Sequence, residues 1–168
     1  MAEPIASRPY MPDYGILGPD EGTGLLDWRW AELQITDSRN YWIGTVWPDG
    51  RPHLTPVWAV WLDEAVWFSC GLRARKLRNL RATPYVTVST QDPESPVVID
   101  GLAEVIRDFP AISGFLNAST AKYGPMMDMD FLDPETNATV KVTPTSAFAI
   151  RHDDFAGSPT RWIFPLDA

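Results

Sequence analysis

The chain has 168 residues, the length of one ordinary domain, and its composition excludes several classes of protein. Hydrophobic residues make up 45% and charged residues 21%, which is too apolar for an intrinsically disordered protein. The formal net charge of −8 disfavours a nucleic-acid partner or an anionic membrane surface. One Cys excludes an intrachain disulfide framework. With only two His as well, the chain has too few ligands for a four-coordinate Cys/His zinc site.

The N-terminal region predicts an extended arm. Residues 1–24 contain four prolines and four glycines, and this spacing allows no regular element. Side chains such as Tyr10 and Tyr14 indicate that the arm lies against the remainder, residues 25–168, which we expect to form one domain. No stretch reaches the roughly 20 apolar residues of a membrane span, and no secretory signal pattern is present, so we expect a cytoplasmic protein.

The rest of the chain alternates strands with short helices. A helix is expected over Leu26–Ser38, followed by a strand over Tyr41–Trp47, a turn at Asp49-Gly50 and a return strand over Pro52–Leu62. Six or seven strands around short helices predict a mainly β (α+β) domain that closes as a small barrel. The later elements are strands over Ala65–Cys70, Tyr85–Gln91, Val97–Arg107, Thr139–Arg151 and Thr160–Phe164, and helices over Leu72–Ala82 and Phe109–Tyr123.

A cluster of basic side chains gives the strongest functional signal. Arg73, Arg75, Lys76, Arg78 and Arg81 are five of the 14 basic residues, and no acid lies among them. Three of them fall in the first turns of the predicted helix, where the helix dipole disfavours cations by about 0.3–1 kcal/mol each. A strand, a Gly turn, a helix N-terminus and clustered cations are together typical of a phosphate site. A solvated basic face is the alternative interpretation.

The return strand gives the second signal because it is largely apolar on both faces. Alternation places His53, Thr55 and Val57 on one face, as in an interior or interface strand. Pro56 cannot donate to a sheet ladder, so it predicts an edge, a bulge or a place where a planar ligand meets the backbone. His53 has two interpretations, a polar contact to a ligand or a hydrogen-bonded residue beside the turn.

In this order the pieces resemble the pyridoxamine-phosphate-oxidase-like split β-barrels of the flavin/deazaflavin oxidoreductase superfamily. The resemblance runs from Tyr41 to Asp108 and rests on three segments in register: Tyr41–Trp58, Val66–Gly71 leading into Arg75–Leu80, and Val97–Ile106. It implies a six- to seven-stranded split β-barrel of the FMN-binding type. It also implies a homodimer with two cofactor sites at the interface.

The resemblance further implies a bound flavin or deazaflavin, either FMN or coenzyme F-420. The strand after the first hairpin would contact the ring and its ribityl chain, while the end of the third strand and the start of the following helix would hold the phosphate. Carried over by position, the implied cofactor-binding residues are His53, Thr55, Pro56, Val57, Trp58, Ser69, Arg73, Arg75, Lys76 and Asn79.

The chain departs from true pyridoxamine-phosphate oxidases at two places. Ser95-Pro96 stands where those enzymes carry a Gln, and Ser158–Phe164 lacks their Arg/His substrate motif. The resemblance therefore implies hydride transfer between F-420, or FMN, and an unidentified small organic substrate, with no catalytic side chain and no metal required. The alternatives are an FMN-dependent enzyme closer to the oxidases, a non-catalytic flavin-binding protein, and a basic helix that binds a nucleic acid or a protein.

Overall fold

The structure is a computed structural model that describes residues 3–165. Residues 1–2 of the predicted arm and residues 166–168 of the predicted domain lie outside the described residues. The helices are α1 (Trp28–Asp37), α2 (Arg75–Ala82) and α3 (Phe109–Tyr123), with a short 3₁₀ helix at His152–Asp154. The strands are β1 (Ile5–Ser7), β2 (Tyr41–Val46), β3 (Pro52–Val57), β4 (Ala59–Leu62), β5 (Ala65–Gly71), β6 (Tyr85–Thr90), β7 (Val97–Ile106), β8 (Asn137–Ala149) and β9 (Thr160–Ile163).

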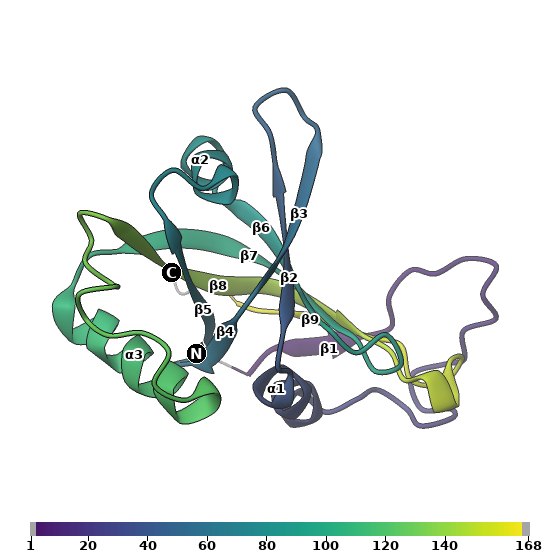
Figure 1. The fold of residues 1–168 in the computed structure, drawn as a ribbon. Coiled ribbons are helices and arrows are strands. Elements are labelled where there is room, and N and C mark those ends of the chain that lie inside the picture. Colours follow the sequence, from purple (N-terminus) through teal and green to yellow (C-terminus); the bar gives the residue numbers. More distant parts are fainter. Residues whose placement is uncertain (1–2, 166–168) are drawn as a thin grey trace.

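One antiparallel sheet contains all nine strands of residues 3–165 and curves around the core (Figure 1). Seven strands follow the order β1-β9-β8-β7-β6-β2-β3, and β5 pairs with both β8 and β4. The 13-residue β8 is the central strand, because it pairs with β5, β7 and β9. The predicted mainly β fold with short flanking helices is confirmed.

Two details of the predicted barrel are wrong, the number of strands and the closure. The sequence predicts six or seven strands where the described chain has nine, because the arm contributes β1 and the return strand is divided into β3 and β4. The arm forms a regular element because Ile5–Ser7 pairs with β9, a partner that lies far away in the sequence. The sheet stays open, since in residues 3–165 β3 pairs only with β2 and β4 only with β5.

The division of the return strand falls at Trp58 and explains how the barrel is split. The residues before Trp58 extend the sheet beyond β2, and those after it extend the sheet beyond β5. One stretch of chain therefore connects the two edges that a closed barrel would join by hydrogen bonds. Pro56 lies in β3 opposite Trp42, so the predicted edge position of this proline is confirmed.

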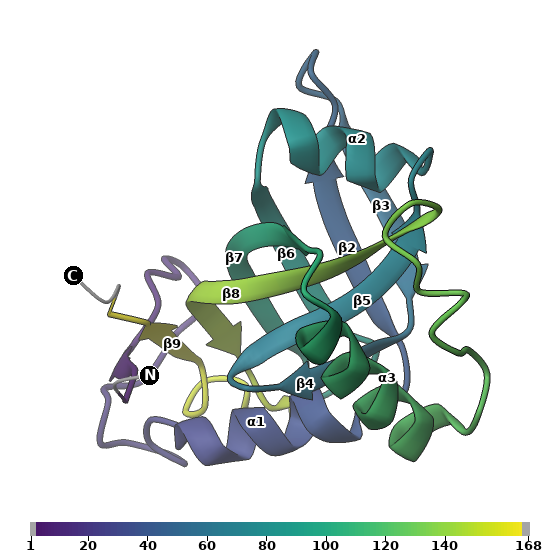
Figure 2. The ribbon, with the colours of Figure 1, turned by 90° about the vertical axis from the view of Figure 1, so that its left-hand side faces the viewer.

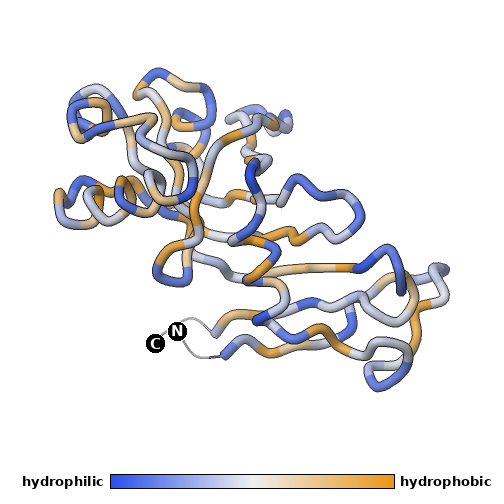
Figure 3. The backbone as a smooth tube through the Cα atoms, turned by 60° about the horizontal axis from the view of Figure 1, so that its bottom comes forward, coloured by the Kyte–Doolittle hydropathy of each residue, from blue (hydrophilic) through white to orange (hydrophobic). Residues whose placement is uncertain are grey.

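The sheet buries apolar side chains on both sides of β5. Val66 and Phe68 face the main core inside the curved sheet, whereas Ala65 and Trp67 face a second cluster formed with α3. In Figure 2, α1 and α2 lie at opposite ends of the curved sheet, and α3 runs beside β4 and β5. Loop tips at the rim are the most hydrophilic parts of the chain in Figure 3. No helix in residues 3–165 is long and apolar enough to cross a membrane.

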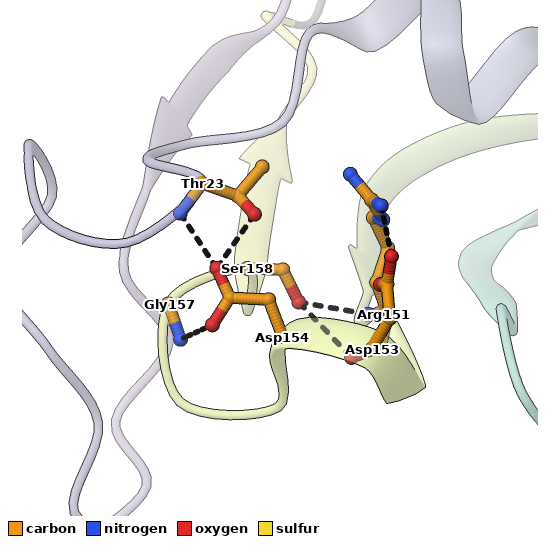
Figure 4. A network of polar contacts seen from close by, with 6 residues as sticks. All are labelled: Thr23, Arg151, Asp153, Asp154, Gly157 and Ser158. Atoms are coloured by element: carbon orange, nitrogen blue, oxygen red, sulfur yellow. Dashed lines mark hydrogen bonds and ion pairs between the residues drawn. The ribbon is translucent and has the colours of Figure 1, made fainter.

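The N-terminal arm is fixed to the loop after β8 by polar contacts (Figure 4). The carboxylate of Asp154 accepts hydrogen bonds from the backbone N–H and hydroxyl of Thr23, both at 2.6 Å, and from Gly157 N at 3.0 Å. The Arg8 guanidinium donates to four backbone carbonyls, those of Gly18, Glu21, Gly157 and Pro159. The arm therefore lies against the rest of the chain through polar contacts, whereas Tyr10 and Tyr14, from which the contact was expected, are 92% and 61% exposed.

We predict that Asp154→Asn loosens this contact. The Asn side chain is uncharged and has one acceptor oxygen in place of two, so it cannot accept all three hydrogen bonds. Backbone hydrogens of residues 17–24 should therefore exchange faster, as measured by hydrogen–deuterium exchange mass spectrometry. The matched control is Asp153→Asn, because within residues 3–165 that neighbouring carboxylate is paired with Arg151 and not with the arm. Equal exchange in the two variants would contradict the assignment.

The effect should also depend on pH. Hydrogen bonds from the Thr23 side chain and backbone lower the pKa of Asp154. A carboxylate with a lowered folded-state pKa stabilises the fold above its unfolded pKa of about 3.9, and that contribution disappears as the pH falls through the folded value. The difference in stability between wild type and Asp154→Asn should therefore vanish in acid.

Candidate cofactor site

One end of the sheet combines three elements, α2, the end of β5 and the inner face of the β2–β3 hairpin. The register places His53 opposite Thr45 and Thr55 opposite Ile43, and Thr45 and Ile43 are buried. His53, Thr55 and Val57 therefore share the inner face of the hairpin, and α2 packs against β2 on this side (Figure 1). Pro56 lies on the opposite, exposed face of β3.

The start of α2 leaves backbone donors free. Ala74 precedes the helix and offers no side-chain cap, and the first turn contains no acid. Within residues 3–165 the N–H groups of Arg75, Lys76 and Leu77 find no acceptor, because the first helical bond runs from Arg78 N to Ala74 O. Three N–H groups at the positive end of a helix dipole favour an anion.

The basic side chains around this helix start form no ion pair within residues 3–165, although the pKa of Asp49 at the hairpin tip is lowered by its hydrogen bond with Arg51 and, to a smaller extent, by the charge of Arg75. The ion pairs of residues 3–165 join other residues, so none of the basic cluster is ion-paired there. The Arg75 guanidinium lies 3.7 Å from the centre of the Trp47 ring, and Arg51 lies 4.5 Å from the same ring. Trp47 and Arg51, at the tip of the β2–β3 hairpin, were not identified from the sequence, although a Trp and an Arg flanking a turn are a usable signal.

Ser69 lies near the end of β5, in the segment that leads into α2 and Lys76. Ser69 is partly buried and lies opposite Thr139 of β8. Burial raises the pKa of the neighbouring Cys70 thiol, while the positive charges of Lys76 and Arg81 act in the opposite direction. A hydroxyl, an ammonium and free N–H groups are suitable partners for phosphate oxygens.

Asn79 occupies a different position from the other predicted site residues, because it is fully buried under α2. Its Nδ2 donates to Thr45 Oγ1 at 3.0 Å, and Thr45 Oγ1 lies 3.3 Å from His53 Nδ1. The edge of the Trp47 ring packs near the same imidazole, with centroids 6.4 Å apart. Thr45 was not identified from the sequence, since a strand threonine gives no local sign that it connects two elements.

The polar groups around this end of the sheet fit a flavin or a deazaflavin. Thr55 Oγ1, Asn79 Oδ1 and Thr139 Oγ1 are buried and have no hydrogen-bond partner within residues 3–165. Thr55 lies on the inner face of β3, and Asn79 lies under α2 beside Thr45. Thr139 is paired with Ser69 and Ile106, so it lies on the α3-facing side of the sheet, away from the hairpin. Buried polar groups normally have partners, and a ring with carbonyl oxygens and nitrogens, a polyol chain and a phosphate offers many. No group of three potential metal-ligating residues occurs among the described residues.

Trp58 lies at the bend between β3 and β4 and is supported by α3. Its ring stacks on Tyr123 at a centroid distance of 5.9 Å and stays half exposed. Tyr123 Oη accepts from Ala59 N at 3.1 Å and lies 2.7 Å from Ala59 O. Lys122 Nζ donates to Ala59 O at 3.2 Å and to Tyr41 Oη at 2.6 Å. The bend therefore presents a fixed aromatic surface at the end of β3.

Comparison with known proteins identifies the family. The profile of the family described as Pyridoxamine 5'-phosphate oxidase matches residues 30–151, which is most of the chain. The chain belongs to this family. No curated protein matches it individually.

Three solved structures show how widely this fold is shared. A conserved hypothetical protein, Rv2991 from Mycobacterium tuberculosis, is 22% identical, with a TM-score of 0.67 over 83% of this chain and 88% of that one. A protein titled F420 Reductase is 26% identical, with a TM-score of 0.58 over 69% and 94%. A pyridoxamine 5'-phosphate oxidase-related, FMN-binding protein from Nostoc punctiforme is 15% identical, with a TM-score of 0.60 over 87% and 94%.

We predict that Lys122 titrates far below an ordinary lysine. Burial lowers its pKa to about 8. Since the unfolded chain then binds more protons between that value and about 10.4, the contribution of Lys122 to stability rises with pH across this window. NMR of the lysine ε-methylene groups, assigned with Lys122→Arg, measures the pKa directly. A value near 10.4 would contradict the described burial.

Proposed function

We propose that this protein is a flavin- or deazaflavin-dependent oxidoreductase that binds F-420 or FMN between α2 and the β2–β3 hairpin. The observation that carries the proposal is the anion site at the start of α2. There, Arg75 and Lys76 accompany three free N–H groups, in a chain whose net charge is −8. Unpaired cations at a helix N-terminus are unfavourable for folding alone, which supports a role in binding.

The residues divide into a phosphate end and a ring end. Ser69, Arg73 and the start of α2 would hold the phosphate. Along the inner face of β3, His53, Thr55 and Val57 would contact the ring and the ribityl chain, with Trp58 at the far end. Pro56 lies on the opposite face of β3, so its side chain would not take part. When bound, the cofactor supplies hydride transfer, and the protein orients it and shields one face of the ring. A small organic substrate would lie on the exposed ring face, near Trp58 and Tyr123.

F-420 is the preferred cofactor of the two. Its phosphodiester and acidic tail need more positive charge than the single phosphate of FMN. Arg73 and Arg78 are exposed and form no ion pair within residues 3–165, so they remain available for such a tail. The similarity to a protein titled F420 Reductase supports this choice, and the similarity to an FMN-binding protein keeps FMN as the alternative.

We predict that Lys76→Ala weakens binding of F-420 or FMN about 10- to 100-fold. This is the loss expected for one charge-assisted hydrogen bond of about 1.5–3 kcal/mol. Visible absorbance and fluorescence titrations measure the affinity. The matched control is Arg29→Ala, which removes the same charge from an exposed position on α1 at the other end of the sheet, and it should bind as the wild type does.

The proposal fails if neither cofactor binds to the wild type, or if Lys76→Ala and Arg29→Ala bind equally well. Strongly salt-dependent RNA binding without any flavin affinity would instead favour a nucleic-acid partner for α2.

A non-catalytic flavin-binding protein is the second candidate, since a split barrel can hold a flavin without turning it over. Rapid-mixing experiments on the loaded protein separate the two. Cofactor that is reduced and then reoxidised by an organic acceptor supports an enzyme, and a bound cofactor that never cycles supports the second candidate.

We further propose that the protein is a homodimer formed through the outer face of β2, β3 and β6. Trp42, Val46, Leu54 and Tyr85 are exposed there by 42–68%. The register places Gly44 between Leu54 and Thr87, so these side chains form one continuous surface. An exposed apolar surface of this kind marks an interaction site.

We predict that Leu54→Glu converts a dimer into a monomer, because a buried unpaired carboxylate at the interface is strongly unfavourable. Size-exclusion chromatography with light scattering measures the mass. Phe109→Glu is the matched control, since Phe109 is 62% exposed and Leu54 63%, but Phe109 lies on α3. A wild-type monomer, or a dimeric Leu54→Glu variant, would contradict the proposal.

A further inference from the structure

The hydrogen bonds of Thr45 determine where the proton of the neutral His53 ring resides. Asn79 Nδ2 can only donate, so Thr45 Oγ1 accepts that bond. The hydroxyl keeps one hydrogen, and among residues 3–165 its remaining partner is His53 Nδ1, at 3.3 Å. Because Thr45 is 3% exposed, a hydroxyl hydrogen without an acceptor would be costly. Thr45 therefore donates to Nδ1, and Nδ1 carries no hydrogen.

The opposite direction of the hydrogen bonds from His53 through Thr45 to Asn79 is less favourable. If the Asn79 carboxamide were turned over, its oxygen would accept from Thr45, and His53 would donate from Nδ1. Both hydrogens of the amide would then occupy the position where Oδ1 now has no partner. Asn79 is fully buried, so two donors would be left unsatisfied instead of one acceptor and one donor.

The other ring nitrogen of His53 is the one available to a ligand. His53 is partly exposed, and Nε2 has no hydrogen-bond partner among the described residues. The nearby Trp47 ring, inclined by 74°, restricts the imidazole from one side. Nε2 bears the hydrogen when Nδ1 does not, so His53 presents a neutral donor on the inner face of β3.

We infer that Thr45 is a positioning residue that fixes His53 as the Nε2–H tautomer, so that His53 donates a hydrogen bond to an acceptor atom of the bound ligand. The identity of that acceptor rests on the proposed function, where it is a carbonyl oxygen or an unprotonated ring nitrogen of the cofactor. The tautomer itself rests only on Thr45 and Asn79. A site with a fixed donor discriminates against ligands that present a hydrogen at this point.

The ¹⁵N spectrum of the imidazole rings tests the inference in ligand-free, uniformly labelled protein at alkaline pH. We expect His53 to show a pyridine-type Nδ1 and a pyrrole-type Nε2, as a single tautomer. The exposed His152 is the internal reference for an unrestrained ring. In Thr45→Val the two nitrogen shifts of His53 should move toward those of His152, and in Thr45→Ser they should stay as in the wild type.

The same variants also test the contact with the ligand. Thr45→Val should bind F-420 or FMN about 2- to 10-fold more weakly, the loss expected for one neutral hydrogen bond that is no longer well oriented, and Thr45→Ser should bind normally. A pyrrole-type Nδ1 on His53, or an unchanged spectrum in Thr45→Val, overturns the inference. The expected spectrum in a protein that binds neither cofactor would refute the proposed function and leave the tautomer assignment intact.

Discussion

The bend at Trp58 is the constraint on which the rest of the structure depends. A chain that leaves one sheet edge and joins another loses its ladder bonds at the crossing, and its N–H and C=O groups need other partners. Tyr123 and Lys122 supply them for Ala59, from the last turn of α3. These contacts allow one stretch of chain to pair first with β2, as β3, and then with β5, as β4. The barrel therefore stays open beside β3.

The same arrangement brings the residues of the proposed site together at one end of the sheet. β3 is an edge strand, so within residues 3–165 one of its two edges has no neighbouring strand. α2 begins there with cations where folding alone favours acids, and without a capping side chain. Each feature costs some stability, and proteins accept such costs at functional sites. The large core around Phe68 and Trp162, together with the second cluster under α3, offsets that cost.

Local patterns in the sequence were sufficient for most elements. The helix Phe109–Tyr123 is predicted with its observed bounds from its apolar side chains, and the structure adds that Asp108 caps its start and Gly124 follows its end. The basic cluster was also readable from the sequence, since charge and turn signals are local. The pairing of Ile5–Ser7 with β9 was not, and neither was the break at Trp58, because both depend on partners far away in the chain.

The candidate site, too, could be predicted from the sequence only where its residues are close together in the chain. Arg75 and Lys76 follow from a pattern of strand, glycine and helix, and Ser69 from the family resemblance, whereas the contacts of Thr45 depend on a buried amide 34 residues away. The contact of Trp47 with Arg51 and Arg75 forms only because the hairpin tip lies beside α2 in the folded chain. A sequence pattern can therefore indicate the phosphate end of such a site, and the orientation of the ring end has to come from tertiary contacts.

Mapping of backbone amide shifts by NMR, during titration with F-420 and separately with FMN, tests the central claim most directly. The account predicts that the largest changes occur at the N–H groups of Arg75, Lys76 and Leu77, followed by Thr55 and Val57. Changes centred on α1 or on the loop after β8, or no changes with either compound, would contradict it.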